Sequence, residues 1–298
     1  MITPKILWKF SRPLPAKATV VQVVAAYALA MHHAGVLRFD AVAFVLALVC
    51  ASGLHVYVNG VNQLSDIEID RINKSSLPLA SGVMSEREGL VVTIGAAILS
   101  LVIGATQSMS LLVTAVLYLV NGSLYSLPPV RLKSTAFGAG GIIAITRGVI
   151  LPLGMFSYFN TVLSGAPGLS FEAVILAVFS FGIVFSVALV KDIPDIEGDS
   201  RNGLKTAAIV FGPSLTFRLA VGLVSLSYAL LVIAGLVRLS PLVGLLLLVT
   251  HLGLLAFFLM RSRAVRLDDK MSVGRFYQLF WKLMYAEYIV FPAICFFI

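Results

Sequence analysis

The chain has little of what soluble and secreted proteins use to stay folded in water. Charged residues make up only 12% of its 298 positions, and it has just two cysteines, Cys50 and Cys295. Both cysteines fall inside long apolar runs, so the sequence does not indicate a disulfide framework and favours small buried side chains. Acidic residues are scarce as well, with 14 against 22 lysines and arginines.

Hydrophobic residues account for 59% of the chain, and the mean hydropathy is +0.99. Runs of about 20 apolar residues, long enough to cross a lipid bilayer as a helix, recur from one end to the other. Nine are found, at 16–36, 41–62, 88–107, 109–128, 137–158, 171–190, 214–236, 240–260 and 277–298. We therefore predict an all-α integral membrane protein with one domain over 1–298, built as a nine-helix bundle around a central cavity that opens to the cytoplasmic side.

The net charge of +8 is unevenly distributed. If the N-terminus is cytoplasmic, all lysines and arginines except Arg38, Arg147 and Arg238 fall in or beside the inner segments. This follows the positive-inside rule, so the basic balance reflects membrane topology and predicts no nucleic-acid partner. The expected location is a cytoplasmic membrane of prokaryotic type, with the N-terminus and the longer, polar inner loops in the cytoplasm.

Half of the acidic residues sit in two short clusters on that same side. They are Asp66, Glu68 and Asp70, and then Asp192, Asp195, Glu197 and Asp199. Asn62, Asp66 and Asp70 are spaced to share one helical face, as are Asp192, Asp195 and Asp199, while Pro194 predicts that the sixth span ends and a new turn begins. Because each cluster follows an apolar span, we expect the two to face each other.

Facing carboxylates beside a membrane need a cation, and hard oxygen ligands favour Mg²⁺ or Ca²⁺. Two such ions could bind a diphosphate and stabilise it as a leaving group. An apolar helix bundle beside them would hold the attached isoprenoid chain. Arg131, Lys133 and Lys191 are on the correct side to complete the neutralisation. Arg147 is the lone charge within a span and is treated as functional.

The acidic segments and several other stretches of the chain resemble a known family. Residues 62–74 (NQLSDIEIDRINK) and 191–199 (KDIPDIEGD) are similar to the two aspartate motifs of UbiA-type intramembrane aromatic prenyltransferases. Residues 73–82, 125–133 (YSLPPVRLK) and 280–288 (FWKLMYAEY) resemble the homogentisate prenyltransferase branch. Leu14 and Pro15 stand where that branch more often has His-Thr.

The resemblance implies a Mg²⁺-dependent transfer of a prenyl group from its diphosphate to an electron-rich aromatic ring, with loss of CO₂ from the acceptor in the homogentisate branch. It implies five catalytic aspartates, Asp66, Asp70, Asp192, Asp195 and Asp199. All but Asp192 would hold two metal ions together with Asn62, while Asp192 would deprotonate or orient the acceptor. Substrate-binding residues would be Asn62, Arg71, Lys74, Tyr125, Arg131, Lys133, Arg147 and Lys191, with Arg12 on an acceptor carboxylate.

Several alternatives stay open. The acceptor could be homogentisate, 4-hydroxybenzoate, a quinolone or another phenol, and the protein could instead be an intramembrane terpene cyclase or a transporter of cations or phosphorylated solutes. His55, seven residues before Asn62, either faces the cavity or is a buried hydrogen-bonded histidine. The aromatic residues of the last span, including Trp281, either form an interfacial belt or shield a carbocation.

Overall fold

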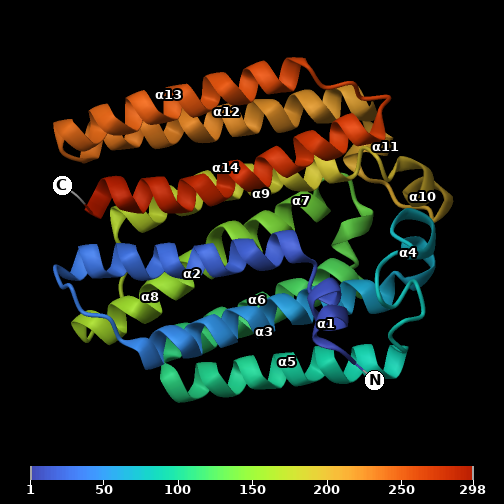
Figure 1. Cartoon of the computed structure of the whole chain (residues 1–298), viewed down its shortest axis with the longest axis horizontal. Helices are drawn as coiled ribbons and strands as arrows, with labels where there is room; N and C mark the ends of the chain where they lie inside the picture. The colour runs from blue at the N-terminus through green and yellow to red at the C-terminus, as the bar shows by residue number, and fades with distance from the viewer. Residues whose placement is uncertain (1, 297–298) are drawn as a thin grey trace.

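The computed structural model describes residues 2–296, and over this range the chain is a bundle of helices with no strand (Figure 1). The helices are α1 (Pro4–Phe10), α2 (Pro13–Ala34), α3 (Ala41–Ser65), α4 (Ile67–Asn73), α5 (Glu86–Gln107), α6 (Met109–Ser126), η1 (Leu132–Ser134), α7 (Gly138–Ile143), η2 (Ala144–Ile150), α8 (Leu151–Ser164), α9 (Phe171–Lys191), α10 (Ile196–Arg201), α11 (Ala207–Val210), α12 (Gly212–Arg238), α13 (Pro241–Arg263) and α14 (Lys270–Phe296).

Nine helical segments within 2–296 are long and apolar enough to cross a membrane, with α7, η2 and α8 together forming the fifth. Each matches one of the predicted runs, so the all-α fold and the number of spans are confirmed. Most of the observed helices extend the apolar runs by a few residues, whereas α2 and α6 each end two residues earlier than predicted. Helix α14 starts earlier than expected, at Lys270 instead of 277. Residues 297–298 of the ninth predicted run lie outside the described part of the chain.

Local sequence explains where the helices begin. Ser85 caps α5 in a capping box with Glu88, and Asp40 and Ser170 accept from backbone N–H groups at the starts of α3 and α9. Such caps satisfy N–H groups that have no partner within the helix, which matters most where there is little water. The chain thus marks its span boundaries with short polar side chains.

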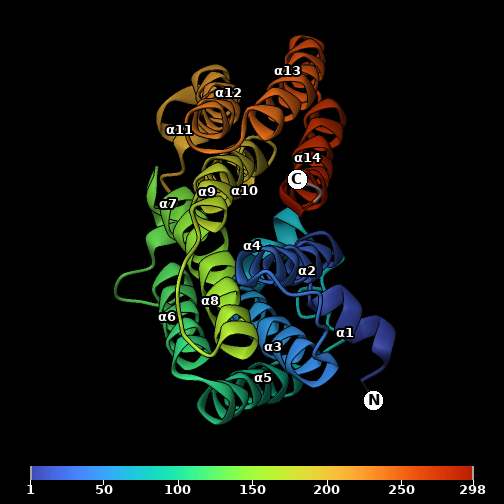
Figure 2. The same cartoon turned by 90° about the vertical axis from the view of Figure 1, so that its left-hand side faces the viewer.

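Helices that are far apart in sequence pack closely through small residues. A side chain at Gly148 of η2 would come within 2.7 Å of the Phe181 backbone in α9, and one at Gly53 of α3 would meet Ala96 O of α5 at 2.9 Å. Close approach through glycine is typical of membrane helices, because van der Waals contact replaces the hydrophobic effect there. Figure 2 looks along the bundle and shows α5 and α13 at opposite extremes, with α2, α8 and α9 between them.

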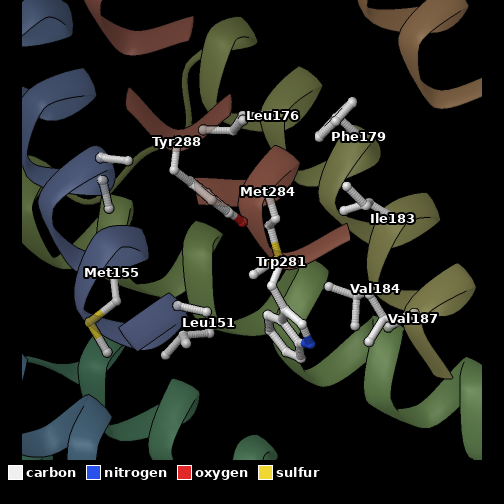
Figure 3. Close-up of a cluster of buried hydrophobic side chains, with 14 of the residues drawn as sticks. Leu151, Met155, Leu176, Phe179, Ile183, Val184, Val187, Trp281, Met284 and Tyr288 are labelled. Carbon is white, nitrogen blue, oxygen red and sulfur yellow. The ribbon is translucent and has the colours of Figure 1, made fainter. Parts of the chain in front are cut away.

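The core forms where α8, α9 and α14 meet (Figure 3). Figure 3 shows the indole of Trp281 opposite Val184 and Val187 of α9. At one end of the bundle, the short helices α4, α10 and α11 gather (Figure 1). Both acidic clusters belong to that end. Helix α4 carries part of the first cluster, α10 carries part of the second, and the two helices contact one another.

Candidate active site

A pocket of about 260 Å³ lies at the end of the bundle that carries α4 and α10. We call it the acidic pocket. It collects the predicted metal-binding residues and several predicted substrate-binding cations; those lining it are Asn62, Asp66, Asp70, Asp192, Asp195, Asp199, Arg12, Lys74, Tyr125, Lys133 and Lys191. Side chains from α3, α4, α6, η1, α9 and α10 and from the residue before α2 therefore meet at one place, as the facing of the two clusters predicts.

The first cluster does not lie on one continuous helix, and that expectation was wrong. Helix α3 ends at Ser65, Asp66 adopts a non-helical conformation (φ −125°, ψ 19°), and Asp70 belongs to α4. Asp66 is held at this break by two cations, with Arg131 3.1 Å and Lys133 2.6 Å from its carboxylate oxygens. Attraction to these cations replaces the regular helical stacking of the acidic side chains.

The second cluster is also divided, at the place that Pro194 predicts. Helix α9 ends at Lys191 with Asp192 as its C-cap, and α10 begins after Asp195. Lys191 donates to the Tyr125 hydroxyl at 3.0 Å and lies 3.6 Å from Asp192. The turn between α9 and α10 thus lets Asp192 line the pocket from the end of one helix and Asp195 and Asp199 line it from the start of the next.

Direct contacts join the two clusters. Lys74 Nζ lies 2.5 Å from Asp195 Oδ2, and Asn73 donates to Asp199 Oδ1 at 3.1 Å. Arg12 donates to Asn62 Oδ1 at 3.0 Å and lies 3.7 Å from Asp70 Oδ2. Asn73 was missed by the sequence analysis as a site residue, although it belongs to the first aspartate motif.

Burial changes the acid–base behaviour of the pocket. Removal from water raises the pKa of Asp70, of Asp192 and of Asp199, the last to about 6, and neighbouring aspartates raise the pKa of each further. Burial also lowers the pKa of Lys133 to about 8, against the attraction of Asp66. A cation bound among these carboxyl groups would stabilise their ionised forms, which burial and mutual repulsion disfavour.

The donor set fits a hard divalent cation. Asp70 Oδ2 is buried without a hydrogen-bond partner among the described residues, and the other donors are carboxylate and amide oxygens, as Mg²⁺ prefers. Within 2–296 no group of three acidic, His or Cys side chains is already arranged around one point. Lys74 and Lys133 instead contact the carboxylate oxygens of Asp195 and Asp66.

A second, larger cavity of about 560 Å³ adjoins the acidic pocket, and we call it the deep cavity. The two share six residues: Arg12, Asn62, Lys74, Tyr125, Lys191 and Tyr277. Its wall continues along apolar side chains of α7 and α9, such as Ile143 and Val184, and ends at Trp281. The arrangement joins a charged entrance to an apolar chamber.

Arg147 lines the deep cavity and is held by neutral groups. Its guanidinium donates to Pro15 O at 2.7 Å, to Thr19 Oγ1 at 3.1 Å and to His55 Nδ1 at 2.9 Å. His55 is therefore the buried hydrogen-bonded histidine of the two alternatives, and it is not among the residues that line this cavity.

The backbone around Arg147 is a π-helix, a turn often found at functional sites. In a π-helix the Arg147 carbonyl would accept from residue 152, which is Pro152 and has no N–H, while Leu151 N donates to Thr146 O. Gln22 Nε2 supplies the missing donor at 2.8 Å. Sequence analysis missed Gln22, because one amide among apolar residues gives no pattern.

Two predicted substrate-binding residues lie elsewhere. Arg71 is half-exposed, pairs with Glu68 at 2.6 Å and lines neither cavity. Arg131 reaches the site only through Asp66, although η1 and the loop before it place it nearby. Tyr118, which was also missed, lines the deep cavity seven residues before Tyr125 on α6.

Comparison with known proteins agrees with this geometry. A sequence model of the UbiA prenyltransferase family matches residues 19–284. The chain is 36% identical to the homogentisate phytyltransferase of Synechocystis sp., over 98% of this chain and 96% of that protein. It is 33% identical to the chloroplastic homogentisate phytyltransferase 1 of Arabidopsis thaliana, over 96% of this chain and 74% of that protein.

The fold is also that of solved structures. A UbiA homolog from Archaeoglobus fulgidus, bound to GPP and Mg²⁺, superposes with a TM-score of 0.68 at 18% identity, covering 98% of this chain and all of that one (100%). A structure of the same homolog bound to DMAPP and Mg²⁺ superposes with a TM-score of 0.67, also at 18% identity, over 98% of this chain and 99% of that one. At this level of identity the likeness concerns the arrangement of helices.

Proposed function

This chain is a member of the UbiA prenyltransferase family, and from that premise we propose that it transfers an isoprenoid chain from a prenyl diphosphate to homogentisate or a closely related aromatic acceptor. It is a multi-pass membrane enzyme that carries out prenyl transfer to an aromatic acceptor. The identity of the acceptor rests on its homogentisate phytyltransferase relatives.

The observation that carries the proposal is the junction of the two cavities. Carboxylates and cations converge on the acidic pocket, and the apolar chamber begins at residues that both cavities share, such as Asn62 and Lys191. A prenyl diphosphate has the same division between a highly charged head and a hydrocarbon tail. We place its diphosphate in the acidic pocket and its chain in the deep cavity.

Asn62, Asp66, Asp70, Asp195 and Asp199 would hold two Mg²⁺ ions. Bound Mg²⁺ supplies neutralising charge to a diphosphate leaving group. Lys74, Lys133 and Lys191, whose ammonium groups now contact pocket aspartates or Tyr125, would bind diphosphate oxygens. These side chains arrive from separate loops, so the fold positions the charges before the substrate enters.

In the transfer step the bond between C1 of the prenyl group and the diphosphate oxygen breaks, and its electron pair leaves with the diphosphate. A bond forms from C1 to an aromatic carbon, which then loses its proton. With homogentisate, loss of CO₂ leaves an electron pair on the side-chain carbon, which takes up a proton. Asp192, which lies beside Lys191 in the acidic pocket, is the group that we propose accepts the ring proton or orients the acceptor.

Topology completes the proposal. The acidic pocket lies at the end of the bundle with the basic inner loops, so we place it and the N-terminus on the cytoplasmic side. Donor and acceptor would then enter from the cytoplasmic leaflet.

The test is an assay of purified protein with prenyl diphosphates of graded length, each with homogentisate, 4-hydroxybenzoate, another phenol or no acceptor, in Mg²⁺ or EDTA. The proposal predicts a prenylated aromatic product and released diphosphate only with metal and acceptor, with homogentisate preferred. Cyclic hydrocarbon without acceptor would identify a terpene cyclase. Metal-dependent uptake into proteoliposomes without chemistry would identify a transporter, and either result overturns the proposal.

A further inference from the structure

Arg147 is a buried cation without an acidic partner. Its side-chain contacts are a backbone carbonyl, a hydroxyl and an imidazole, and no ion pair to it occurs among residues 2–296. Its Nε is buried and donates no hydrogen bond within that range. A charge in a membrane span is costly unless an opposite charge offsets it, so this group favours an anion.

The imidazole beside it does not supply that anion, and it is not a second cation. A guanidinium only donates, so His55 Nδ1 accepts the hydrogen bond from Arg147. The ring proton is then on Nε2, which donates to Ser11 O at 2.6 Å. His55 is therefore neutral, and the full positive charge of Arg147 stays uncompensated.

The lining of the deep cavity around Arg147 also favours an anion. Its wall contains five cationic side chains and, among the residues that line it, no Asp or Glu: Lys9, Arg12, Lys74, Arg147 and Lys191. The acidic pocket, in contrast, sets five aspartates against its cations. Whatever anion enters the deep cavity meets donors and no carboxylate.

Arg147 lies farther into the bundle than the acidic pocket, where we place the diphosphate. His55, which it contacts, precedes Asn62 by seven residues on α3, a distance of about 10 Å along a helix. Tyr118 precedes Tyr125 by the same number on α6, which packs against η2. Neither Arg147 nor Tyr118 lines the acidic pocket, and both line the deep cavity.

Two uncharged hydrogen-bonding groups line this chamber and lack partners within 2–296. They are the Tyr118 hydroxyl and the indole N–H of Trp281, and both are buried. Buried polar groups without partners are rare, and each here can donate. Together with Arg147 they form a set suited to the oxygen atoms of a small polar ring compound.

We propose that Arg147 binds the ionised acid group of the aromatic acceptor and that Tyr118 donates to the same molecule. This inference rests on the proposed function and assigns the acceptor subsite within it. The prenyl chain is uncharged and the diphosphate has its own pocket, which leaves the acceptor as the anion. Arg12, the residue expected for this role, already has Asp70 3.7 Å away, whereas Arg147 forms no ion pair with any carboxylate of residues 2–296.

The test compares binding of homogentisate with that of its methyl ester, which differs by one charge. Trp281 lines the cavity and the chain has only two tryptophans, so its fluorescence in a Trp8→Phe background reports binding directly. The parent should bind the acid about 10-fold to 100-fold more tightly than the ester. Arg147→Gln should bring this ratio close to one, Arg147→Lys should retain part of it, and the exposed control Arg218→Gln should leave it unchanged.

Tyr118→Phe provides a second variant that removes no hydrogen bond within the described protein. It should fold at least as stably as the parent and bind homogentisate roughly threefold to tenfold more weakly. A purely structural role for Arg147 predicts a lower Tm with an unchanged acid-to-ester ratio. A diphosphate role predicts a higher KM for the prenyl diphosphate, again with an unchanged ratio, and either result overturns the inference.

The two proposals fail in different ways. Prenyl transfer by the parent protein with an acid-to-ester binding ratio near one would refute the acceptor subsite alone. Absence of metal-dependent diphosphate release with every acceptor would refute the proposed function, whatever the ratio.

Discussion

Lys74 Nζ lies 2.5 Å from Asp195 Oδ2, although 121 residues separate the two in sequence. The lysine ends α4 and the aspartate precedes α10, so this ion pair ties together the two acidic segments at the entrance of the site. A cationic side chain thus occupies a carboxylate oxygen that we assign to a metal ion. The ion pair therefore stabilises the metal-free protein, and a metal ion that binds Asp195 has to displace Lys74.

Lys74→Met should therefore make the protein more responsive to Mg²⁺. Without the ammonium group the pocket aspartates repel one another, and the Tm in EDTA should fall by about 2 °C. Added Mg²⁺ should raise the Tm of the variant by more than it raises that of the parent. Thermal unfolding in detergent measures both; Lys205→Met, at an exposed lysine, is the control, and equal Mg²⁺ responses in parent and variant would contradict the prediction.

Acidic residues of the same motifs should differ sharply in importance. Asp66→Asn or Asp195→Asn should reduce diphosphate release by more than about 100-fold without unfolding the protein, because each removes a proposed metal ligand. Glu68→Gln and Glu197→Gln are matched controls, since these exposed carboxylates pair with Arg71 and Arg201 outside both cavities. Activity that survives either aspartate change, or is lost in either control, would argue against the assigned metal site.

Gln22 should act as a positioning residue for Arg147. Gln22→Leu removes the donor to the Arg147 carbonyl, which Pro152 leaves without a helical partner, and should cost about 1–3 kcal/mol of stability. We also expect a higher KM for the acceptor and an unchanged KM for the prenyl diphosphate. Tyr288→Phe, which removes another contact of the same amide, is the comparison and should leave the acceptor KM nearly unchanged.

The pair His251–Glu287 should stabilise the fold without taking part in catalysis. It joins α13 to α14 at 2.8 Å, both side chains are fully buried, and neither residue lines the two cavities. His251→Leu or Glu287→Leu should each destabilise by about 3–5 kcal/mol, because one polar group is left unpaired, and the double variant should recover much of that loss. Additive losses in Tm, or a change in kcat at low temperature, would contradict this role.

Asp269 should make stability depend on pH. Hydrogen bonds from the backbone N–H groups of Ser272 and Met271, with Arg266 beside it, lower the pKa of this carboxyl at the start of α14. A carboxyl with a lowered folded-state pKa stabilises the fold above its ordinary pKa and loses that contribution as the pH falls through the folded value. Asp269→Asn should thus lower Tm near pH 7, and its difference from the parent should disappear as the pH falls through the lowered pKa of Asp269. Asp268→Asn, at the exposed neighbouring residue, is the matched control.

Sequence alone predicts the spans from the long apolar runs, and it predicts the meeting of the two acidic clusters because each cluster follows an apolar span. It does not predict the helix break at Asp66, which depends on Arg131 and Lys133 from a distant loop. Nor does it place α14 correctly, since the helix continues past its apolar run into a polar first turn at Lys270. The contact between His55 and Arg147 lies outside any local pattern, because it joins two spans 92 residues apart.

The π-helix at η2 has a consequence for insertions and deletions in the fifth span. Its wider turn takes up an extra residue. Ile143 before the π-helix and Arg147 within it line the deep cavity, while Met155 and Phe159 after it pack into the core. Deleting one residue between 144 and 150 would remove this extra residue and restore the α-helical pitch with the two halves in their present orientation, whereas a deletion in α8 would rotate one half against the other by about 100°. After a deletion in α8 the core side chains beyond it would face the wrong neighbours, so the fifth span should tolerate the loss of one residue within η2 far better than the loss of one within α8.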